Sequence, residues 1–186
     1  KTDNIAGAML ATNHLVGLGH TRIAFISGPA QLATSQERFS GYRDALMSKG
    51  IPFDERLVIE GDFRMESGHE AMGQLMNGFD CRCKSGFTAV FAANDLMAVG
   101  AVTALEEGGL RVPTDVAVMG YDDINIASVM RPRLSTIAQP KYEMGWIAAE
   151  TIIKRMSEPK GSRMEEILQP MLVVRDSTVE RRGALA

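Results

Sequence analysis

Cysteines and long apolar runs are scarce in this chain. Its 186 residues include only two cysteines, Cys81 and Cys83, one residue apart. Such a pair forms no disulfide framework, and a metal site would need further ligands nearby, so we interpret both as reduced thiols in a loop. No apolar run could cross a bilayer, and the opening Lys1–Asn4 is unlike a signal peptide. We therefore expect a cytoplasmic protein without a metal site or a membrane partner.

Positive charge and catalytic motifs are scarce too. The formal net charge is −3, so the composition does not suggest a nucleic-acid-binding surface. Neither His-Glu-x-x-His nor Gly-x-Ser-x-Gly occurs, and Gly17-x-Gly19 lacks the third glycine of a dinucleotide-binding turn. The adjacent Asp122 and Asp123 should point in different directions, which makes a poor acid–base pair. We expect no enzyme activity and no cofactor.

The sequence instead alternates short apolar runs with helical patterns. Hydrophobic residues make up 45% of the chain, enough for a real core. The apolar runs predict strands at residues 23–27, 57–59, 87–92, 116–119 and 135–138. Strands that alternate with helices are typical of βαβ units, so the sequence predicts an α/β fold with a parallel sheet.

Four helices are expected, one before the first strand and three between the strands. The first has an apolar stripe that begins at Ile5 and ends at Gly17 or Gly19, and the second closes at Gly50. The third follows a capping-box pattern, Ser67 with Glu70. Asn94 can cap the fourth, which should run to about residue 107.

One strand leads directly to two carboxylates. Val116–Met119 is followed by Gly120, Tyr121, Asp122 and Asp123. Ligands of open α/β sheets bind beyond the carboxyl ends of the strands, so Asp122 or Asp123 should face such a crevice. A carboxylate can accept hydrogen bonds from two sugar hydroxyls. The alternative is an acid that stabilises a helix N-terminus, which suits Asp123 better.

Several segments, taken together, resemble the LacI/GalR family of transcription regulators. They run in the family's order over nearly the whole chain: residues 17–26, 37–42, 92–98, 112–123, 131–140 and 172–178. The resemblance implies a doubly wound parallel sheet of the type I periplasmic-binding-protein-like kind. It also implies an incomplete two-lobed core without the family's DNA-binding domain: residues 1–138 and 169–186 in the C-terminal lobe, and 139–168 as a helix and strand reaching into the N-terminal lobe.

The resemblance also implies a site for a small effector. Asp122 matches the acid that contacts the effector, and Arg38 matches the arginine of an Arg-x-x-Gly segment. A guanidinium suits vicinal hydroxyls or a carboxylate, with a surface arginine beside Glu37 as the alternative. Asn94 can both donate and accept, besides its capping role.

Two further positions match effector contacts of the family. Phe63 matches an aromatic residue that stacks on the effector ring, with ordinary core packing as the alternative. Thr34 lies where relatives place a small polar contact, but it could equally cap a helix in a Thr-x-x-Glu box with Glu37.

The function implied is that of the effector-binding core of a sugar- or nucleoside-responsive repressor. Effector binding would favour one arrangement of the lobes and change the spacing of two DNA-binding heads in a homodimer. Val99 and Met130 occupy dimer-surface positions of the family, with packing inside the chain as the alternative. Operator DNA would be bound only through the absent domain. The alternative function is a periplasmic sugar-binding component of a transport system.

The expected helix over residues 142–156 is unusual because it is apolar on more than one side. Trp146, Ala149, Ile153 and Met156 share one stripe, and Met144, Ala148 and Ile152 share another. A helix that is apolar all round expects burial. We predict that this helix packs on another chain or is poorly ordered.

Overall fold

A parallel four-stranded sheet forms the centre of the computed structural model, which describes residues 1–79, 86–157 and 166–178. The strand order is β2 (Val58–Glu60), β1 (Ile23–Ser27), β3 (Ala89–Ala92) and β4 (Ala117–Met119). Phe25 of β1 pairs with Val58 on one side and with Phe91 on the other. Strands β3 and β4 are buried throughout, as their apolar runs predicted.

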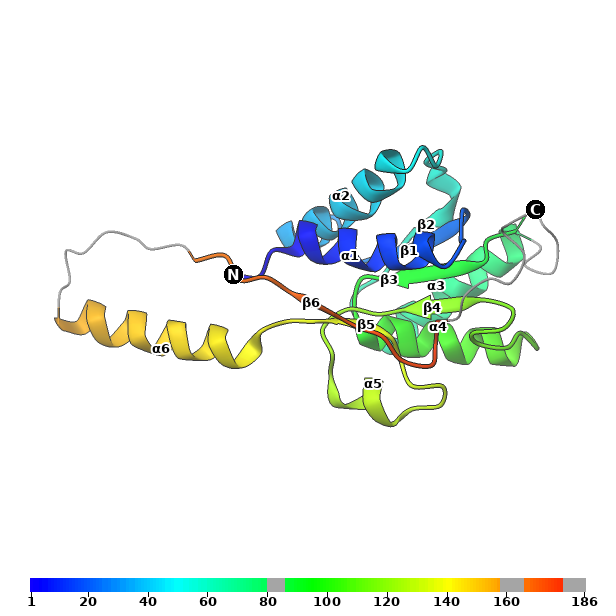
Figure 1. Cartoon of the computed structure of the whole chain (residues 1–186). Coiled ribbons are helices and arrows are strands. Elements are labelled where there is room, and N and C mark those ends of the chain that lie inside the picture. Colours follow the sequence, from blue (N-terminus) through cyan, green and yellow to red (C-terminus); the bar gives the residue numbers. More distant parts are fainter. Residues whose placement is uncertain (80–85, 158–165, 179–186) are drawn as a thin grey trace.

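Two helices cover each face of the sheet (Figure 1). Helices α1 (Asn4–Gly17) and α2 (Ala33–Ser48) pack together on one face, and α3 (Met65–Gly78) and α4 (Asp95–Glu107) on the other. A 3₁₀ turn, Glu55–Leu57, precedes β2. Helix α2 lies on one face of the sheet and the next helix, α3, on the other. The order in which the strands are added therefore reverses between β1 and β3, which is the topological switch point of the sheet. The predicted doubly wound fold is confirmed.

Aromatic rings fill the face under α2. The rings of Phe25 and Tyr42 stack with centroids 4.8 Å apart, and Phe91 lies 5.1 Å from Phe25. The Tyr42 hydroxyl donates to the carbonyl of Ile23 at 2.7 Å, so its polar group is satisfied inside the core.

The fifth expected strand does not extend the parallel sheet as a full member. Strand β5 (Thr136–Ala138) pairs antiparallel with β6 (Met171–Val173) in a two-stranded ribbon. Isolated parallel bridges still join Ser135 to Met119 and Ala138 to Asp122, so β5 runs beside the end of β4. Between these elements lies the short helix α5 (Asn125–Val129).

Helix α6 (Lys141–Ser157) extends from the β5–β6 ribbon away from the rest of the molecule (Figure 1). At its base three stretches of chain come together. The Asp3 amide donates to the Leu168 carbonyl at 2.9 Å, and the Thr2 hydroxyl donates to Gln139 Oε1 at 2.8 Å. Within the described residues, no helix has the length and apolarity that a membrane span requires.

Several local predictions are confirmed and two are wrong. Helix α1 ends at Gly17, and Asn94 caps α4 by accepting from the Met97 amide at 2.9 Å. Ile5 is exposed, because the side of α1 that packs on α2 is built from small residues such as Ala8 and Ala11.

The capping-box prediction for α3 is the second error. The helix starts two residues before Ser67, and its N-cap is Arg64. The Ser67 hydroxyl instead accepts from the Asp62 amide and donates to the Arg64 carbonyl, both at 3.0 Å, because the chain turns sharply before the helix. The cysteine pair lies outside the described residues.

Candidate functional site

Four segments follow the carboxyl ends of the parallel strands and meet at one edge of the sheet. Gly28 follows β1, Phe63 follows β2, Asn94 follows β3 and Asp122 follows β4. Helix α2 adds Arg38 to the same edge. The side chains of Arg38 and Asp122 are in contact, and Asn94 contacts the backbone of Phe63. This is the edge at which open α/β sheets bind ligands.

Arg38 is the centre of the polar cluster. It is buried, with its Nε donating to Asn4 Oδ1 at 3.0 Å and its Nη1 donating to the Ala93 carbonyl. Its Nη2 lies 3.3 Å from Asp122 Oδ1. The guanidinium carbon also sits 3.8 Å from the centre of the Tyr121 ring. These contacts hold the guanidinium rigidly, and they make the alternative of a surface arginine wrong.

Asp122 receives two donors on one oxygen. Besides Arg38, the side-chain amide of Gln139 donates to Oδ1 at 2.6 Å. Burial raises the pKa of Asp122 above its ordinary value, while the charge of Arg38 and the Gln139 hydrogen bond lower it. In the described part of the chain both of these donors bond Oδ1 and no side chain donates to Oδ2, so Oδ2 can accept from a ligand hydroxyl.

Asn94 and Phe63 form the neighbouring part of the edge. Asn94 Oδ1 caps α4, and its Nδ2 donates to the Phe63 carbonyl at 2.8 Å. Phe63 has a left-handed backbone, with φ of 70°. Its ring lies against Gly28, where an added Cβ would collide with it. The ring also packs on the hydrophobic core, so the packing alternative raised for Phe63 is present whether or not the ring stacks on a ligand.

Thr34 lies apart from these contacts. It is exposed in the first turn of α2, and the N-cap of that helix is Leu32, which forms no side-chain cap. The alternative of a cap paired with Glu37 is therefore wrong. Glu37 instead accepts from Asn4 Nδ2 at 2.8 Å, which holds it toward α1.

The two residues expected at a dimer surface are largely covered within the chain. Val99 is 9% exposed, and Met130 packs partly on the core. Leu96 and Val129, their neighbours on α4 and α5, are 36% and 68% exposed. The apolar surface that another chain could cover is therefore provided more by these neighbours than by the two predicted residues.

Two polar residues of this region were not expected from the sequence. Gln139 contacts Asp122 because β5 returns to the end of β4 before α6 begins. Asp95, buried at the start of α4, accepts from Thr136 Oγ1 at 2.6 Å and from the Ile124 amide at 2.8 Å. The position of Gln139 just after an expected strand was the one signal that could have identified it.

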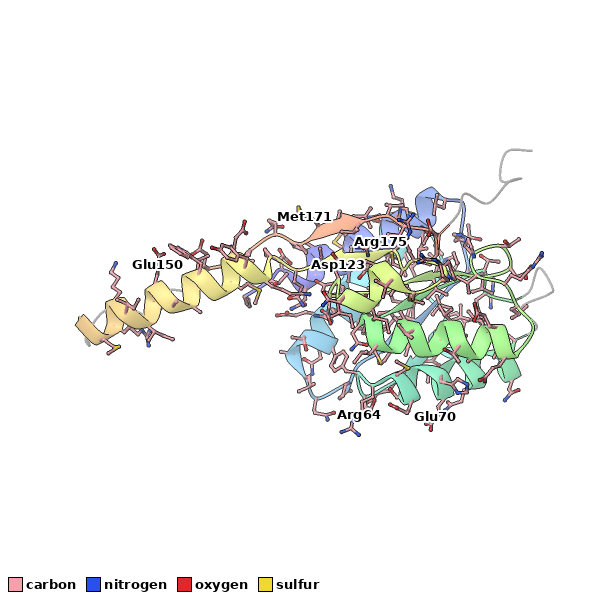
Figure 2. All side chains as sticks on the ribbon, turned by 90° about the horizontal axis from the view of Figure 1, so that it is seen from below. Arg64, Glu70, Asp123, Glu150, Met171 and Arg175 are labelled. Carbon is pink, nitrogen blue, oxygen red and sulfur yellow. The ribbon has the colours of Figure 1, made fainter. Side chains whose placement is uncertain are left out.

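Asp122 and Asp123 point to different partners, as expected for neighbours in a turn. The Arg175 guanidinium donates to Asp123 Oδ1 at 2.7 Å (Figure 2). Asp123 is therefore held by Arg175, which follows β6, rather than by a helix N-terminus. The two carboxylates do not form an acid–base pair. Next to an aromatic ring, this edge offers a guanidinium that donates hydrogen bonds, a carboxylate that accepts them, and an amide that can do both.

Comparison with known proteins assigns the family. The sequence profile described as "Periplasmic binding protein-like domain" matches residues 12–178. The chain belongs to this family. The family assignment confirms the fold expected from the resemblance, and the matching relatives are LacI-family regulators, as the sequence segments indicated.

Three relatives illustrate the similarity. The ribose operon repressor of Escherichia coli K12 is 41% identical over 177 residues, which cover 95% of this chain and 52% of the repressor. The structure of a transcriptional regulator CelR–cellobiose complex has a TM-score of 0.89 and 40% identity, covering 95% of this chain and 52% of that one. A LacI-family regulator from Enterococcus faecium with bound ribose has a TM-score of 0.87 and 32% identity, covering 97% and 65%.

The chain spans about half the length of the curated relatives it matches. These relatives are transcriptional regulators rather than enzymes. They also favour a regulator over a transport component.

Proposed function

We propose that this chain is the effector-binding core of a LacI-type transcription regulator and binds a sugar or a related small molecule at the carboxyl edge of its sheet. The observation that carries the proposal is the cluster in which Arg38 and Gln139 both donate to Asp122 at that edge. Such charge-assisted contacts fix the direction of the carboxylate before a ligand arrives.

Each residue of the proposed site has a distinct role. Asp122 accepts hydrogen bonds from ligand hydroxyls through Oδ2, and Arg38 supplies the opposite charge and a donor beside it. Asn94 adds an amide, and Phe63 offers a ring face to the apolar side of the ligand. Thr34 is the outermost contact, because it is exposed at the start of α2. The ligand is held and not transformed.

The proposal includes a division of the chain into lobes. Residues 1–138 and 169–186 form the C-terminal lobe, and residues 139–168 reach into an N-terminal lobe. Its support is the base of α6, where Thr2, Gln139 and Leu168 lie together as chain segments that would cross between lobes. A homodimer through the α4 and α5 surface, near Val99 and Met130, and operator binding through a separate DNA-binding domain complete the proposal.

Direct measurement of sugar binding tests the effector site. D-ribose, cellobiose and adenosine are titrated into the isotope-labelled chain, and amide shifts are followed by NMR. We expect shifts that gather at Asp122, Asn94 and Phe63, with weak affinity because half of a two-lobed cleft contributes little enclosure. A charged hydrogen bond is worth about 1.5–3 kcal/mol, so Asp122→Asn should weaken binding by about 10- to 100-fold.

A surface carboxylate provides the matched control. Asp115 pairs with the Arg111 guanidinium at 3.0 Å, just before the amino end of β4. Asp115→Asn makes the same chemical change far from the proposed site and should leave the affinity unchanged. A ligand that binds the wild type and Asp122→Asn equally well would contradict the assignment of Asp122.

The regulatory part of the proposal needs the full-length protein. A sugar that binds at Asp122 should change the affinity of that protein for operator DNA, in an amount that Asp122→Asn abolishes. A transport component would bind the sugar without any change in DNA affinity, and that result would favour the alternative function.

A further inference from the structure

Asp95 is a buried carboxylate that no part of the proposed site uses. It is fully buried at the first position of α4, directly after the cap residue Asn94. Burial raises its pKa to about 6. The side chain reaches no surface, so it cannot touch an effector. A charge-bearing group in such a place needs a reason, because burying it is costly unless its hydrogen bonds are made.

Both oxygens of Asp95 accept hydrogen bonds at the turn that carries Asp122, one from the turn itself and one from the adjoining Thr136 of β5. Oδ2 accepts from the Ile124 amide at 2.8 Å, and Oδ1 accepts from Thr136 Oγ1 at 2.6 Å. The same Thr136 hydroxyl accepts from the Asp123 amide at 3.4 Å. Asp95 therefore holds the C-terminal end of the turn in two ways: directly through the Ile124 amide, and indirectly through the Thr136 hydroxyl.

The turn needs these contacts because its backbone conformation is energetically unfavourable. Asp122 and Asp123 have φ values of 110° and 52°, in the left-handed region that residues with a side chain rarely adopt. Gly120 passes so close to Asp95 that a Cβ there would collide with Oδ1. Strained backbone at a site persists only where surrounding contacts determine it.

We propose that Asp95 is the positioning residue of the effector site, which holds the 120–124 turn in the conformation that aims Asp122 at Arg38 and Gln139. This inference rests on the proposed function for its importance to effector binding. The conformational claim itself concerns only residues of this chain. The charged groups that face Asp95 are Asp122 and Asp123, each already bound to an arginine.

The Gln139 side-chain amide reports on the placement of Asp122, because it donates to that carboxylate at 2.6 Å. Its NMR resonances are compared in the wild type, in Asp122→Asn as the reference for a lost carboxylate, and in Asp95→Ala. We expect the Asp95→Ala resonances to move toward those of Asp122→Asn. Asp95→Asn should restore the wild-type position, because an amide can accept from Ile124 and donate to Thr136.

A purely structural role predicts a different result. Loss of a buried hydrogen-bonded group would lower the denaturation midpoint and leave the Gln139 resonances unchanged in the folded protein. That outcome in Asp95→Ala would overturn the proposal, and Asp115→Asn is the control for removal of a carboxylate. Since no sugar is added, failure of sugar binding and failure of this inference are separate results.

Thr136→Val keeps the proposal testable if Asp95→Ala does not fold. Valine has nearly the shape of threonine but cannot relay Asp95 to the Asp123 amide. The Gln139 resonances should move in the same direction and by a smaller amount than in Asp122→Asn. Unchanged resonances in a folded Thr136→Val variant would overturn the proposal.

Discussion

The sheet with its four helices and the projecting helix α6 have similarly apolar sequences but opposite surroundings. Phe25 and Phe91 are completely buried in the sheet, whereas Tyr142, Trp146 and Ile152 of α6 are 82%, 58% and 60% exposed. Figure 2 shows the side chains of α6 standing away from the rest of the molecule. A pattern of apolar residues predicts burial, but whether the residues are buried depends on which elements pack against them.

The proposed site lies at the boundary between these two regions. We call the sheet and its four covering helices the body. The carboxyl edge of the sheet lies where the body joins the β5–β6 ribbon and α6, and Gln139 and Thr2 are residues of this junction. A residue that binds a ligand there is connected both to the sheet and to the base of α6, where Lys141 contacts the Asp123 carbonyl and Met144 contacts Thr2. The following experiments test how far the two regions differ.

The largest expected effect is the removal of an aromatic ring from the sheet. Phe91 is completely buried in β3, with its ring 5.1 Å from that of Phe25. Phe91→Ala should lower the free energy of unfolding by about 3–5 kcal/mol, because a cavity remains. Urea denaturation followed by circular dichroism measures it.

The matched change in α6 is Trp146→Ala, which removes a larger ring. Trp146 is 58% exposed, so its loss should change the free energy of unfolding by no more than about 0.5 kcal/mol. Similar losses for both variants would contradict the contrast between body and α6.

The second effect is the pH dependence contributed by Asp95. Its pKa is raised from 3.8 to about 6, chiefly by burial. A raised acid pKa means that the folded protein binds the proton more tightly than the unfolded chain. The contribution of Asp95 to stability should therefore be largest below pH 3.8 and should fall as the pH rises to about 6. Above about pH 6 it should stay constant, about 3 kcal/mol lower than at acid pH.

Comparison of the wild type with Asp95→Asn isolates this contribution, because other carboxyl groups titrate in both. The unfolding free energy of the wild type minus that of Asp95→Asn, measured in urea from pH 4 to pH 7, should decrease as the pH rises, because only the wild type loses the stability that the bound proton contributes. A difference that is constant over this interval would show that Asp95 has an ordinary pKa.

Much of the body follows from local sequence. Strand β1 occupies residues 23–27 as expected, because an apolar run buried on both faces has few alternatives. Asn94 caps α4 because its side chain bonds the backbone only three residues away. Ile5 was misplaced because the α1–α2 contact selects small residues: Gly41 passes so close to the Ile5 carbonyl that no side chain fits between them.

The site was only partly accessible from the sequence. Strand-end reasoning predicted Asp122 as a ligand contact, whereas Arg38, Asn94, Phe63 and Thr34 were predicted from the family resemblance. Gln139 and Asp95 escaped both approaches. Their roles depend on contacts across 17 and 29 residues and on the left-handed turn at Asp122, which no short pattern encodes.

A pair of glycines gives a smaller and more local test. A Cβ at Gly100 would collide with the Met65 carbonyl where α4 crosses α3, while Gly145 of α6 has nothing within 4 Å. Gly100→Ala should destabilise by about 1–3 kcal/mol through overpacking. Gly145→Ala should instead favour the helix by about 1 kcal/mol and increase helicity. Circular dichroism and urea denaturation measure both, and a destabilising Gly145→Ala would show that α6 has a close neighbour.

The smallest effect is expected from Trp146, the single tryptophan of the chain. Because Trp146 is 58% exposed on α6, its fluorescence should be that of an indole in water and should hardly change when the sheet unfolds in urea. Circular dichroism would then report an unfolding transition that fluorescence misses. If α6 packs on another chain, which is one of the two outcomes predicted from its apolar stripes, the emission should shift to the blue as protein concentration rises. An emission that is blue-shifted at every concentration and moves together with the unfolding of the sheet would place Trp146 against the body and remove the contrast between the two regions.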